Sequence, residues 1–330
     1  MSTATATATE VAAFRQVSKN YGTVRAVDGL DLVLRPGETV ALLGPNGAGK
    51  SSSLDLLLGL REPDTGTVSL FGGSPRAAIE TGRVGAMLQS GGLLGEVKVR
   101  ELVKFACDVH PKGHRPEQVM EKAGITELAE RKVDKLSGGQ EQRVRFALAI
   151  AGANDLIVLD EPTTGMDVSV RQQFWAAMRA EAEAGRTVLF ATHYLEEADS
   201  IADRVLVLHR GRLIADGTAA EIKAKAGARR ISCELHPADG RAEEAVLRAL
   251  PGTVGLDLTV RPDGVTVVRI RTTDADAGVA GLYRAGLYPR ALEVTGLGLE
   301  QAFLTITGEA DASEGTDGPQ STDTHGESAR

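Results

Sequence analysis

The chain lacks the features that mark secreted, membrane-embedded or nucleic-acid-binding proteins. Only two cysteines occur in 330 residues; their spacing fits neither a disulfide framework nor a metal site, so we expect reduced thiols in a cytoplasmic protein. No apolar run approaches the ~20 residues that cross a bilayer. There is no charged-then-apolar leader, so no secretory signal is expected. The net charge of −8 argues against general nucleic-acid binding.

What the chain does contain is a phosphate-binding loop. Residues 44–51 read G-x-x-x-x-G-K-S between an apolar strand at 39–43 and a helical stretch at 52–60, which is the context that this motif requires. The glycines let backbone N–H groups turn toward phosphate oxygens, and the following helix adds its positive end. Lys50 places a charge on the β- and γ-phosphates, and the Ser51 hydroxyl is a ligand for Mg²⁺. The predicted nucleotide-binding residues of this loop are Gly44, Pro45, Asn46, Gly47, Ala48, Gly49, Lys50, Ser51 and Ser52.

A second glycine-rich sequence, L-S-G-G-Q at 136–140, precedes another helical stretch. A serine and two glycines at the start of a helix form an anion site of bare backbone N–H groups. The alternative is a simple helix cap made by Ser137. One chain cannot easily apply two such loops to one γ-phosphate, whereas two chains packed head to tail can, each covering the other's nucleotide. The residues that we expect to face a second copy's nucleotide are Ser137, Gly138, Gly139 and Gln140.

Two strand ends carry the residue types that phosphate hydrolysis needs. Asp160 follows the apolar run at 156–159 and can hold Mg²⁺ through water, and the next residue, Glu161, is placed to polarise the attacking water. The alternative is a solvated acidic turn. His193 follows the apolar run at 188–191 and can contact the γ-phosphate, although a lone histidine at a strand end can also be structural.

Taken in order, these motifs resemble those of the ATP-binding cassette (ABC) ATPase family over residues 17–222. The resemblance implies that Tyr21 stacks on the adenine of ATP and that Gln89 is the Q-loop glutamine, which joins Ser51 and Asp160 as a Mg²⁺ ligand. It also implies catalytic roles for Lys50, Glu161 and His193, and it places Asp167 in the D-loop, where Met166 replaces the usual leucine without a change in volume. From the residues alone, Tyr21 can equally be a half-buried core tyrosine, and Gln89 an ordinary surface glutamine.

The alternation of strands and helices predicts an α/β P-loop NTPase core, with a mainly parallel sheet, an antiparallel β subdomain and a helical subdomain. A disordered tail is expected at 1–10, the ATPase domain at 11–226 and a disordered acidic tail at 309–330. Residues 230–308 read β-α-β-β-α-β with a helix appended, which predicts a small α+β ferredoxin-like domain. The apolar stripe expected on that final helix comprises Leu299, Phe303, Leu304 and Ile306.

The resemblance implies an ATP-hydrolysing subunit that works as a head-to-tail dimer and powers a separate integral-membrane permease of an ABC-2-type exporter, with drug efflux as an analogy. Such a subunit is peripheral on the inner face of the cell membrane. Leu93 and Leu94, between glycines, are expected to line a groove for a cytoplasmic helix of the permease, or else to fold back on the helical subdomain. The alternatives that stay open are an importer ATPase subunit and a non-transport ABC ATPase.

Overall fold

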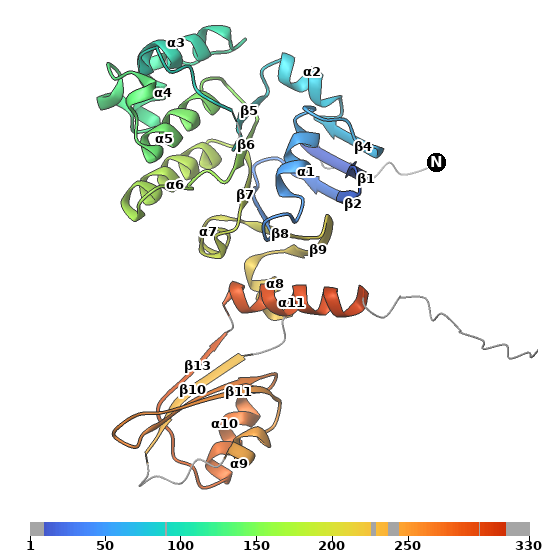
Figure 1. Cartoon of the computed structure of the whole chain (residues 1–330), viewed down its shortest axis with the longest axis vertical. Helices are drawn as coiled ribbons and strands as arrows, with labels where there is room; N and C mark the ends of the chain where they lie inside the picture. The colour runs from blue at the N-terminus through green and yellow to red at the C-terminus, as the bar shows by residue number, and fades with distance from the viewer. Residues whose placement is uncertain (1–9, 90, 226–228, 237–243, 297, 315–330) are drawn as a thin grey trace, which may run out of the picture. The chain divides into compact units, whose positions relative to one another are not determined.

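The computed structural model describes residues 10–89, 91–225, 229–236, 244–296 and 298–314. The chain divides into two compact units, Met1–Ile222 and Lys223–Arg330, and Figure 1 gives the labels of their helices and strands. The tail expected at 1–10 lies outside the described residues except for Glu10, and so do residues 315–330 of the tail expected at the other end. No helix in the described ranges is both long enough and apolar enough to span a membrane.

A six-stranded sheet forms the centre of the first unit, in the order β5 (Val84–Met87), β6 (Leu156–Asp160), β7 (Thr187–Thr192), β3 (Thr39–Leu43), β8 (Arg204–His209) and β9 (Arg212–Gly217). All neighbouring strands are parallel except β8 and β9. Every residue of β3, β6 and β7 is buried, which is why these strands are continuous apolar runs without alternation. The predicted mainly parallel sheet is confirmed.

A second, antiparallel sheet has the order β2 (Val24–Leu34), β1 (Ala12–Tyr21) and β4 (Thr65–Leu70). Its inward side chains, among them Phe14 and Leu34, belong to the same apolar cluster as Val40 and Leu42 of β3. One hydrophobic core therefore joins the two sheets, and the predicted antiparallel β subdomain is confirmed.

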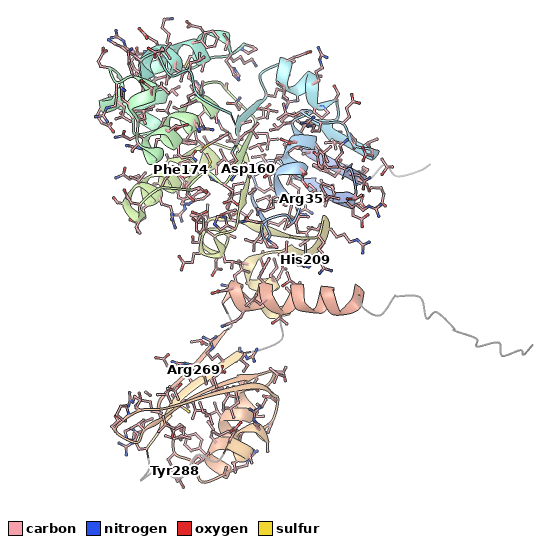
Figure 2. All side chains as sticks on the ribbon, in the orientation of Figure 1. Arg35, Asp160, Phe174, His209, Arg269 and Tyr288 are labelled. Carbon is pink, nitrogen blue, oxygen red and sulfur yellow. The ribbon has the colours of Figure 1, made fainter. Side chains whose placement is uncertain are left out.

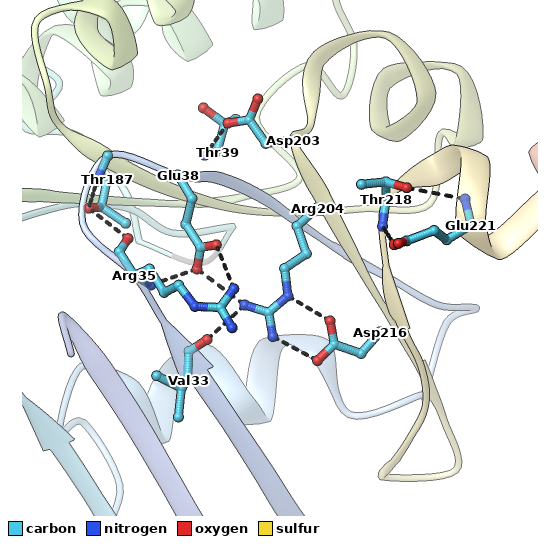
Figure 3. Close-up of polar contacts among 11 residues, drawn as sticks. Val33, Arg35, Glu38, Thr39, Thr187, Asp203, Arg204, Asp216, Thr218 and Glu221 are labelled. Carbon is cyan, nitrogen blue, oxygen red and sulfur yellow. Dashed lines mark hydrogen bonds and ion pairs between the residues drawn. The ribbon is translucent and has the colours of Figure 1, made fainter. Parts of the chain in front are cut away.

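An ion-pair cluster around Arg204 also holds the two sheets together (Figure 3). Its guanidinium donates to both carboxylate oxygens of Asp216, at 2.6 and 2.7 Å, and to the carbonyl of Val33 on β2, at 2.9 Å. Hydrogen bonding to Asp216 and the nearby Glu38 raise the pKa of Arg204 against the opposing effect of burial. Because a bidentate guanidinium–carboxylate pair has a fixed geometry, this cluster sets the position of the β8–β9 hairpin against β2.

Helices α1, α5 and α7 contact strands of the central sheet, and α2 contacts β4 of the antiparallel sheet. Helices α3, α4 and α5 form a group at one end of the unit (Figure 1). Aromatic rings from α5, α6 and β7 pack against one another. Phe174, labelled in Figure 2, lies 4.8 Å from Phe146 and 5.2 Å from Trp175 between ring centroids.

The helices are α1 (Lys50–Leu57), α2 (Pro75–Glu80), α3 (Val99–Val109), α4 (Pro116–Lys122), α5 (Gly138–Ala149), α6 (Val168–Glu183), α7 (Leu195–Ile201) and α8 (Ala219–Lys225). Helix α8 crosses the boundary between the two units. Short 3₁₀ turns occur at Thr126–Leu128 and Val133–Lys135.

The second unit contains a four-stranded antiparallel sheet in the order β11 (Thr253–Val260), β12 (Thr266–Thr272), β10 (Arg229–Leu235) and β13 (Arg290–Gly296). Helix α9 (Glu244–Arg248) follows β10 and helix α10 (Ala275–Arg284) follows β12, so the chain order is β-α-β-β-α-β. This order, with the first and third strands adjacent at the centre, is the predicted ferredoxin-like arrangement. Buried side chains from the sheet and both helices, including Ile231, Ile270 and Leu282, form its core.

The final helix, α11 (Leu299–Glu314), differs from the expectation in two ways. It continues through residues 309–314, which were expected to begin the tail. Its buried positions include Leu299 and Ala302, at 3% and 0% exposure, whereas Leu304 is 62% exposed. The predicted stripe was therefore wrong at Leu304, because helical spacing alone does not show which flank of an apolar stripe is covered.

Candidate functional site

Predicted functional residues from four segments of the first unit meet at one edge of the central sheet. Because β5, β6, β7 and β3 are parallel, their carboxyl ends lie on the same side, which is where ligands bind in such sheets. Gln89 follows β5, Glu161 follows β6, His193 follows β7 and the phosphate-binding loop follows β3. A cleft of about 570 Å³ opens there, lined by Tyr21, Val24, Ala26, Pro45, Asn46, Gly47, Gly49, Lys50, Ser51, Ser52, Gln89, Glu161, Thr164 and His193.

The glycines of the phosphate-binding loop are required by its geometry. Gly49 has a φ of +101°, and a Cβ at this position would lie 2.2 Å from the carbonyl oxygen of Ala26. Gly44 makes the same kind of close approach, since a Cβ there would lie 2.5 Å from the carbonyl oxygen of Leu208. Gly44 and the buried Ala48 are absent from the residues that line the cleft in the described structure, so they support the loop from behind.

Lys50 is the buried cation of the site. Only 6% of it is exposed, and its Nζ donates to the carbonyl oxygens of Gly44, at 2.7 Å, and Pro45, at 3.3 Å. The Nζ also lies 3.6 Å from Oε1 of Glu161. A buried ammonium group is costly unless it is paired, and these three oxygens supply that pairing.

Glu161 connects the cation to the histidine. Its side chain is 7% exposed, and its Oε2 accepts a hydrogen bond from Nδ1 of His193 at 2.7 Å. The backbone of Glu161 is in the left-handed region, with φ of +49°, where a side chain costs of order 1 kcal/mol or more. Its own N–H donates to the carbonyl of Ala191 on β7, at 2.9 Å, so the strained turn is anchored to the strand that leads to His193.

Asp160 ends β6, in the middle of the first unit (Figure 2), and is not among the described residues that line the cleft. Burial raises the pKa of its carboxyl above the ordinary value, and Glu161 adds to the rise, while a hydrogen bond with Ser51 opposes it. Its Oδ1 is buried without a hydrogen-bond partner among the described residues. A buried carboxylate oxygen without a donor, next to a hydroxyl, is the donor chemistry that a hard divalent cation requires. Asp160 and Ser51 therefore fit a Mg²⁺ ion, and Gln89 lines the same cleft.

Ser137 and its neighbours do not join this cleft within one chain. Among the described residues that line it, Ser137, Gly138, Gly139, Gln140 and Asp167 are all absent. Instead Ser137 caps α5: its Oγ accepts from the N–H of Gln140 at 3.4 Å, and its own N–H donates to Oε1 of Gln140 at 3.0 Å. The carboxamide of Gln140 is thus engaged in a capping box, whereas Ser137 and Gly138 are exposed.

Asp167 has a similar structural role at the start of α6. Its side chain accepts from the N–H of Val170 at 2.9 Å, which caps the helix. The carboxylate is nevertheless exposed, and Met166 before it is buried at 5% exposure. Asp167 and the exposed end of α5 are therefore open to another molecule, away from the cleft of their own chain.

Tyr21 lines the cleft with a ring that is 41% exposed. It ends β1 and pairs directly with Val24 across the hairpin to β2. Sequence reasoning missed Val24, Ala26 and Thr164 as lining residues. Val24 could have been found, because the residue opposite an aromatic side chain across a hairpin lies beside it on the sheet.

A phosphate-binding loop, a buried lysine and a strained glutamate bound to a histidine together define a P-loop nucleoside triphosphatase. Comparison with known proteins gives the family. Residues 27–164 match the ABC transporter family. The daunorubicin/doxorubicin resistance ATP-binding protein DrrA of Streptomyces peucetius is 35% identical over 302 residues, which cover 88% of this chain and 90% of that protein. The Nod factor export ATP-binding protein I of Burkholderia orbicola is 40% identical over 211 residues, covering 62% of this chain and 69% of that protein.

Solved structures agree with this fold. A protein described as the ATP-binding subunit of an ABC transporter has a TM-score of 0.61 and 25% identity, and the match covers 66% of this chain and 93% of that one. The ATP-binding cassette MJ0796, in a dimeric post-hydrolysis state with ADP and Pi, has a TM-score of 0.59 and 24% identity, and the match covers 63% of this chain and 98% of that one. The chain belongs to the ABC transporter family, as one of its ATP-hydrolysing subunits.

Proposed function

We propose that this chain powers a membrane exporter by binding and hydrolysing ATP. The observation that carries the proposal is the extent of the match to the DrrA protein, whose name is that of a drug-resistance ATP-binding protein. Its 302 aligned residues exceed the 222 residues of the first unit. The likeness therefore includes much of the ferredoxin-like unit and is not limited to the cassette, which many kinds of transporter share. The names of these relatives do not favour an importer subunit or a non-transport ATPase.

The chemistry of the site follows from its geometry. Lys50 places its charge on the β- and γ-phosphates, exchanging neutral carbonyl oxygens for anionic phosphate oxygens. Glu161 orients the attacking water and receives its proton, because its carboxylate faces the cleft beside the phosphate-binding loop. His193 donates to Glu161 and so fixes the direction of that carboxylate while its ring reaches toward the γ-phosphate. Tyr21 offers its exposed ring to the adenine.

The donor set also supports Mg²⁺ as the cofactor. Ser51 and Asp160 would hold the ion, directly or through water, and Gln89, which lines the same cleft, would contribute its side-chain oxygen. When bound, Mg²⁺ neutralises charge on the β- and γ-phosphate oxygens. The buried Oδ1 of Asp160, which has no hydrogen-bond donor among the described residues, would then be satisfied.

A second copy of the chain would complete the site. Ser137, Gly138 and Gly139 are presented at the start of α5, and Asp167 at the start of α6, away from the cleft of their own chain. A head-to-tail dimer brings these helix starts to the other copy's γ-phosphate, where backbone N–H groups and the positive helix end favour an anion. Gln140 would act there mainly by holding Ser137 in place.

The membrane subunit would be a separate permease, with this chain peripheral to it on the inner face of the cell membrane. Support comes from exposed apolar side chains in and near the group of α3, α4 and α5. Leu94, between Gln89 and α3, is 62% exposed, and Phe105 and Val109, one helical turn apart on α3, are 59% and 62% exposed. Exposed apolar groups of this size are typical of protein contacts. Gln89 would report the state of the nucleotide to this surface.

The function can be tested in inside-out membrane vesicles that contain the chain together with its cognate membrane subunit. ATP-dependent uptake of a fluorescent anthracycline is expected with the wild-type chain and not with Glu161→Gln. Uptake that is the same with both proteins would show that ATP hydrolysis by this chain does not power export. If the vesicles hydrolyse ATP but take up no anthracycline, the analogy with the cargo of the DrrA protein is rejected. Export of other cargoes would then be the next measurement.

A further inference from the structure

A buried carboxylate outside the cleft connects the loops that carry Glu161 and His193. Glu197, on α7, is 4% exposed. Its Oε1 accepts from the hydroxyl of Thr163 at 2.5 Å, and its Oε2 accepts from the hydroxyl of Thr192 at 3.0 Å. Thr163 is two residues after Glu161, and Thr192 directly precedes His193. One carboxylate thus bridges the chain segments that follow β6 and end β7.

The same carboxylate is paired with the start of α6. Nε of Arg171 lies 3.8 Å from Oε1 of Glu197, and the N–H of Arg171 donates to the carbonyl of Asp167 at 2.9 Å. The guanidinium also lies 4.8 Å from the centre of the Tyr194 ring, and that ring lies 4.1 Å from the ring of His193. A continuous series of contacts therefore runs from the helix start at Asp167 to the histidine.

A buried charge in this position is costly, and its environment offsets the cost only through these specific partners. Neither Glu197 nor Thr163 lines the nucleotide cleft within the described structure, so neither contacts ATP. Thr192 is already engaged, because its Oγ accepts from the N–H of Tyr194 at 3.0 Å and must use its own hydrogen toward Glu197. The two threonine hydroxyls therefore donate to different oxygens of Glu197. A carboxylate has two accepting oxygens, whereas the amide of a glutamine has one oxygen and one NH₂ group, so only the carboxylate can accept from both threonines in this way.

We infer that Glu197 is a positioning residue that holds Glu161 and His193 at hydrogen-bond distance and couples them to the D-loop end of α6. The inference rests on the roles proposed above for Glu161 and His193. Its effect is on the rate of hydrolysis, since misplacing a catalytic group by about 1 Å can cost roughly a hundredfold in rate. Nucleotide binding, which depends on the phosphate-binding loop and Tyr21, is left unchanged.

A second buried glutamate, on α6, provides a matched control for Glu197 on α7. Glu181, near the end of α6, is also a buried carboxylate, 2% exposed, and it is paired with Lys122 at 2.7 Å and Arg186 at 2.5 Å. Glu197→Gln and Glu181→Gln remove the same charge from similar burial. In full-length protein, Glu197→Gln is expected to lower kcat by about tenfold to a hundredfold with the ATP Kd within about twofold of wild type. Glu181→Gln is expected to leave both constants within about twofold. Equal effects of the two variants on kcat would overturn the inference.

A double variant shows whether Glu197 acts through His193. If it does, Glu197→Gln combined with His193→Ala hydrolyses ATP no more than about twofold more slowly than His193→Ala alone. Effects that multiply would show that Glu197 does not act through His193 and would overturn the inference that it holds both residues. If Glu197→Gln does not fold, Thr163→Val removes one hydroxyl donor with little change in shape and must lower kcat without changing the ATP Kd. If His193→Ala and Glu161→Gln themselves leave kcat unchanged, the proposed catalytic roles fail; if they lower it and Glu197→Gln does not, only the positioning role fails.

Discussion

Nδ1 of His193 lies 2.7 Å from Oε2 of Glu161, and the other oxygen of that carboxylate lies 3.6 Å from Nζ of Lys50. One buried carboxylate therefore connects the residues that follow three different strands. Its backbone is held in the left-handed region by a hydrogen bond to β7. Glu161, His193 and Lys50 are thus connected to one another by contacts within the protein itself.

Removing the lysine should weaken ATP binding itself. Lys50→Ala is expected to raise the ATP Kd by about tenfold or more, because a charge-assisted contact to phosphate oxygens is lost. Titration with a fluorescent ATP analogue measures this directly. Arg76→Ala is a suitable control, since it removes a cation that pairs with Glu80 on the exposed surface of α2. An unchanged affinity in Lys50→Ala would contradict the role of the phosphate-binding loop.

Truncation should separate the two parts of the carboxyl end. Deletion of residues 309–330 leaves the buried Leu299 and Ala302 in place, so the melting temperature and ATPase activity are expected to stay near wild type. Deletion from Leu299 removes both side chains and should lower the free energy of unfolding by on the order of 3 kcal/mol. Differential scanning calorimetry compares the two proteins. Equal melting temperatures would show that α11 does not stabilise the protein.

Stability should fall in mild acid because of His110. Burial lowers the pKa of its ring below the ordinary value of 6.5, and His114 adds to the effect. Its Nε2 lies 3.0 Å from Nδ2 of Asn154, and the ring packs on Gly82 and Gly152, where added Cβ atoms would meet it at 2.7 and 2.1 Å. Below pH 6.5 the unfolded chain takes up a proton that the folded chain does not, so stability declines as pH falls from 6.5 through the lowered pKa.

Urea unfolding at about pH 7.5 and about pH 5.5 tests this sign. His110→Gln cannot titrate in this range, so it is expected to lose less stability between the two pH values than the wild type does, even if it is less stable at both. His114, whose pKa burial and the nearby Arg186 and Lys122 also lower, remains in both proteins. An identical loss in both proteins would rule out His110 as a source of the acid sensitivity.

The exposed leucine before α3 should matter for transport and not for folding. Leu94 is 62% exposed, whereas Leu93 is only partly exposed, so Leu94→Asp is the cleaner variant. Surface changes of this kind alter the free energy of unfolding by about 0.5 kcal/mol or less. We expect normal ATP binding by the isolated chain and a loss of transport and of ATPase stimulation by the permease. Val260→Asp, at a position 69% exposed in the second unit, is the control. Unimpaired transport by Leu94→Asp would exclude Leu94 from the docking surface.

Much of the fold and the nucleotide cleft could be predicted because the signals are local. The phosphate-binding loop lies between a buried strand and a helix, and the apolar runs before Asp160 and His193 are buried parallel strands. The order β-α-β-β-α-β of the second unit followed from alternation and turn residues, and the observed strand pairing agrees with it.

The features that were missed depend on contacts between distant positions. Glu197 and Thr163 are 34 residues apart, and nothing in the helical pattern of α7 indicates that this glutamate points inward. The side chain of Gln140 accepts the capping hydrogen bond from Ser137, although the sequence motif predicts that it faces a second copy's nucleotide. Sequence alone could not separate the capping role from the nucleotide-contacting role. The exposure of Leu304 depends on what covers α11, which helical periodicity does not reveal.

The central claim is that Glu161 is the base for ATP hydrolysis in a cassette that closes as a dimer. Glu161→Gln keeps the size of the side chain and can still contact His193, but it cannot accept a proton from water. With Mg²⁺ and ATP, the variant should release phosphate at least about a hundredfold more slowly than wild type, and size-exclusion chromatography should show a stable dimer that retains ATP. Hydrolysis near the wild-type rate, or a variant that stays monomeric with bound ATP, would contradict the account.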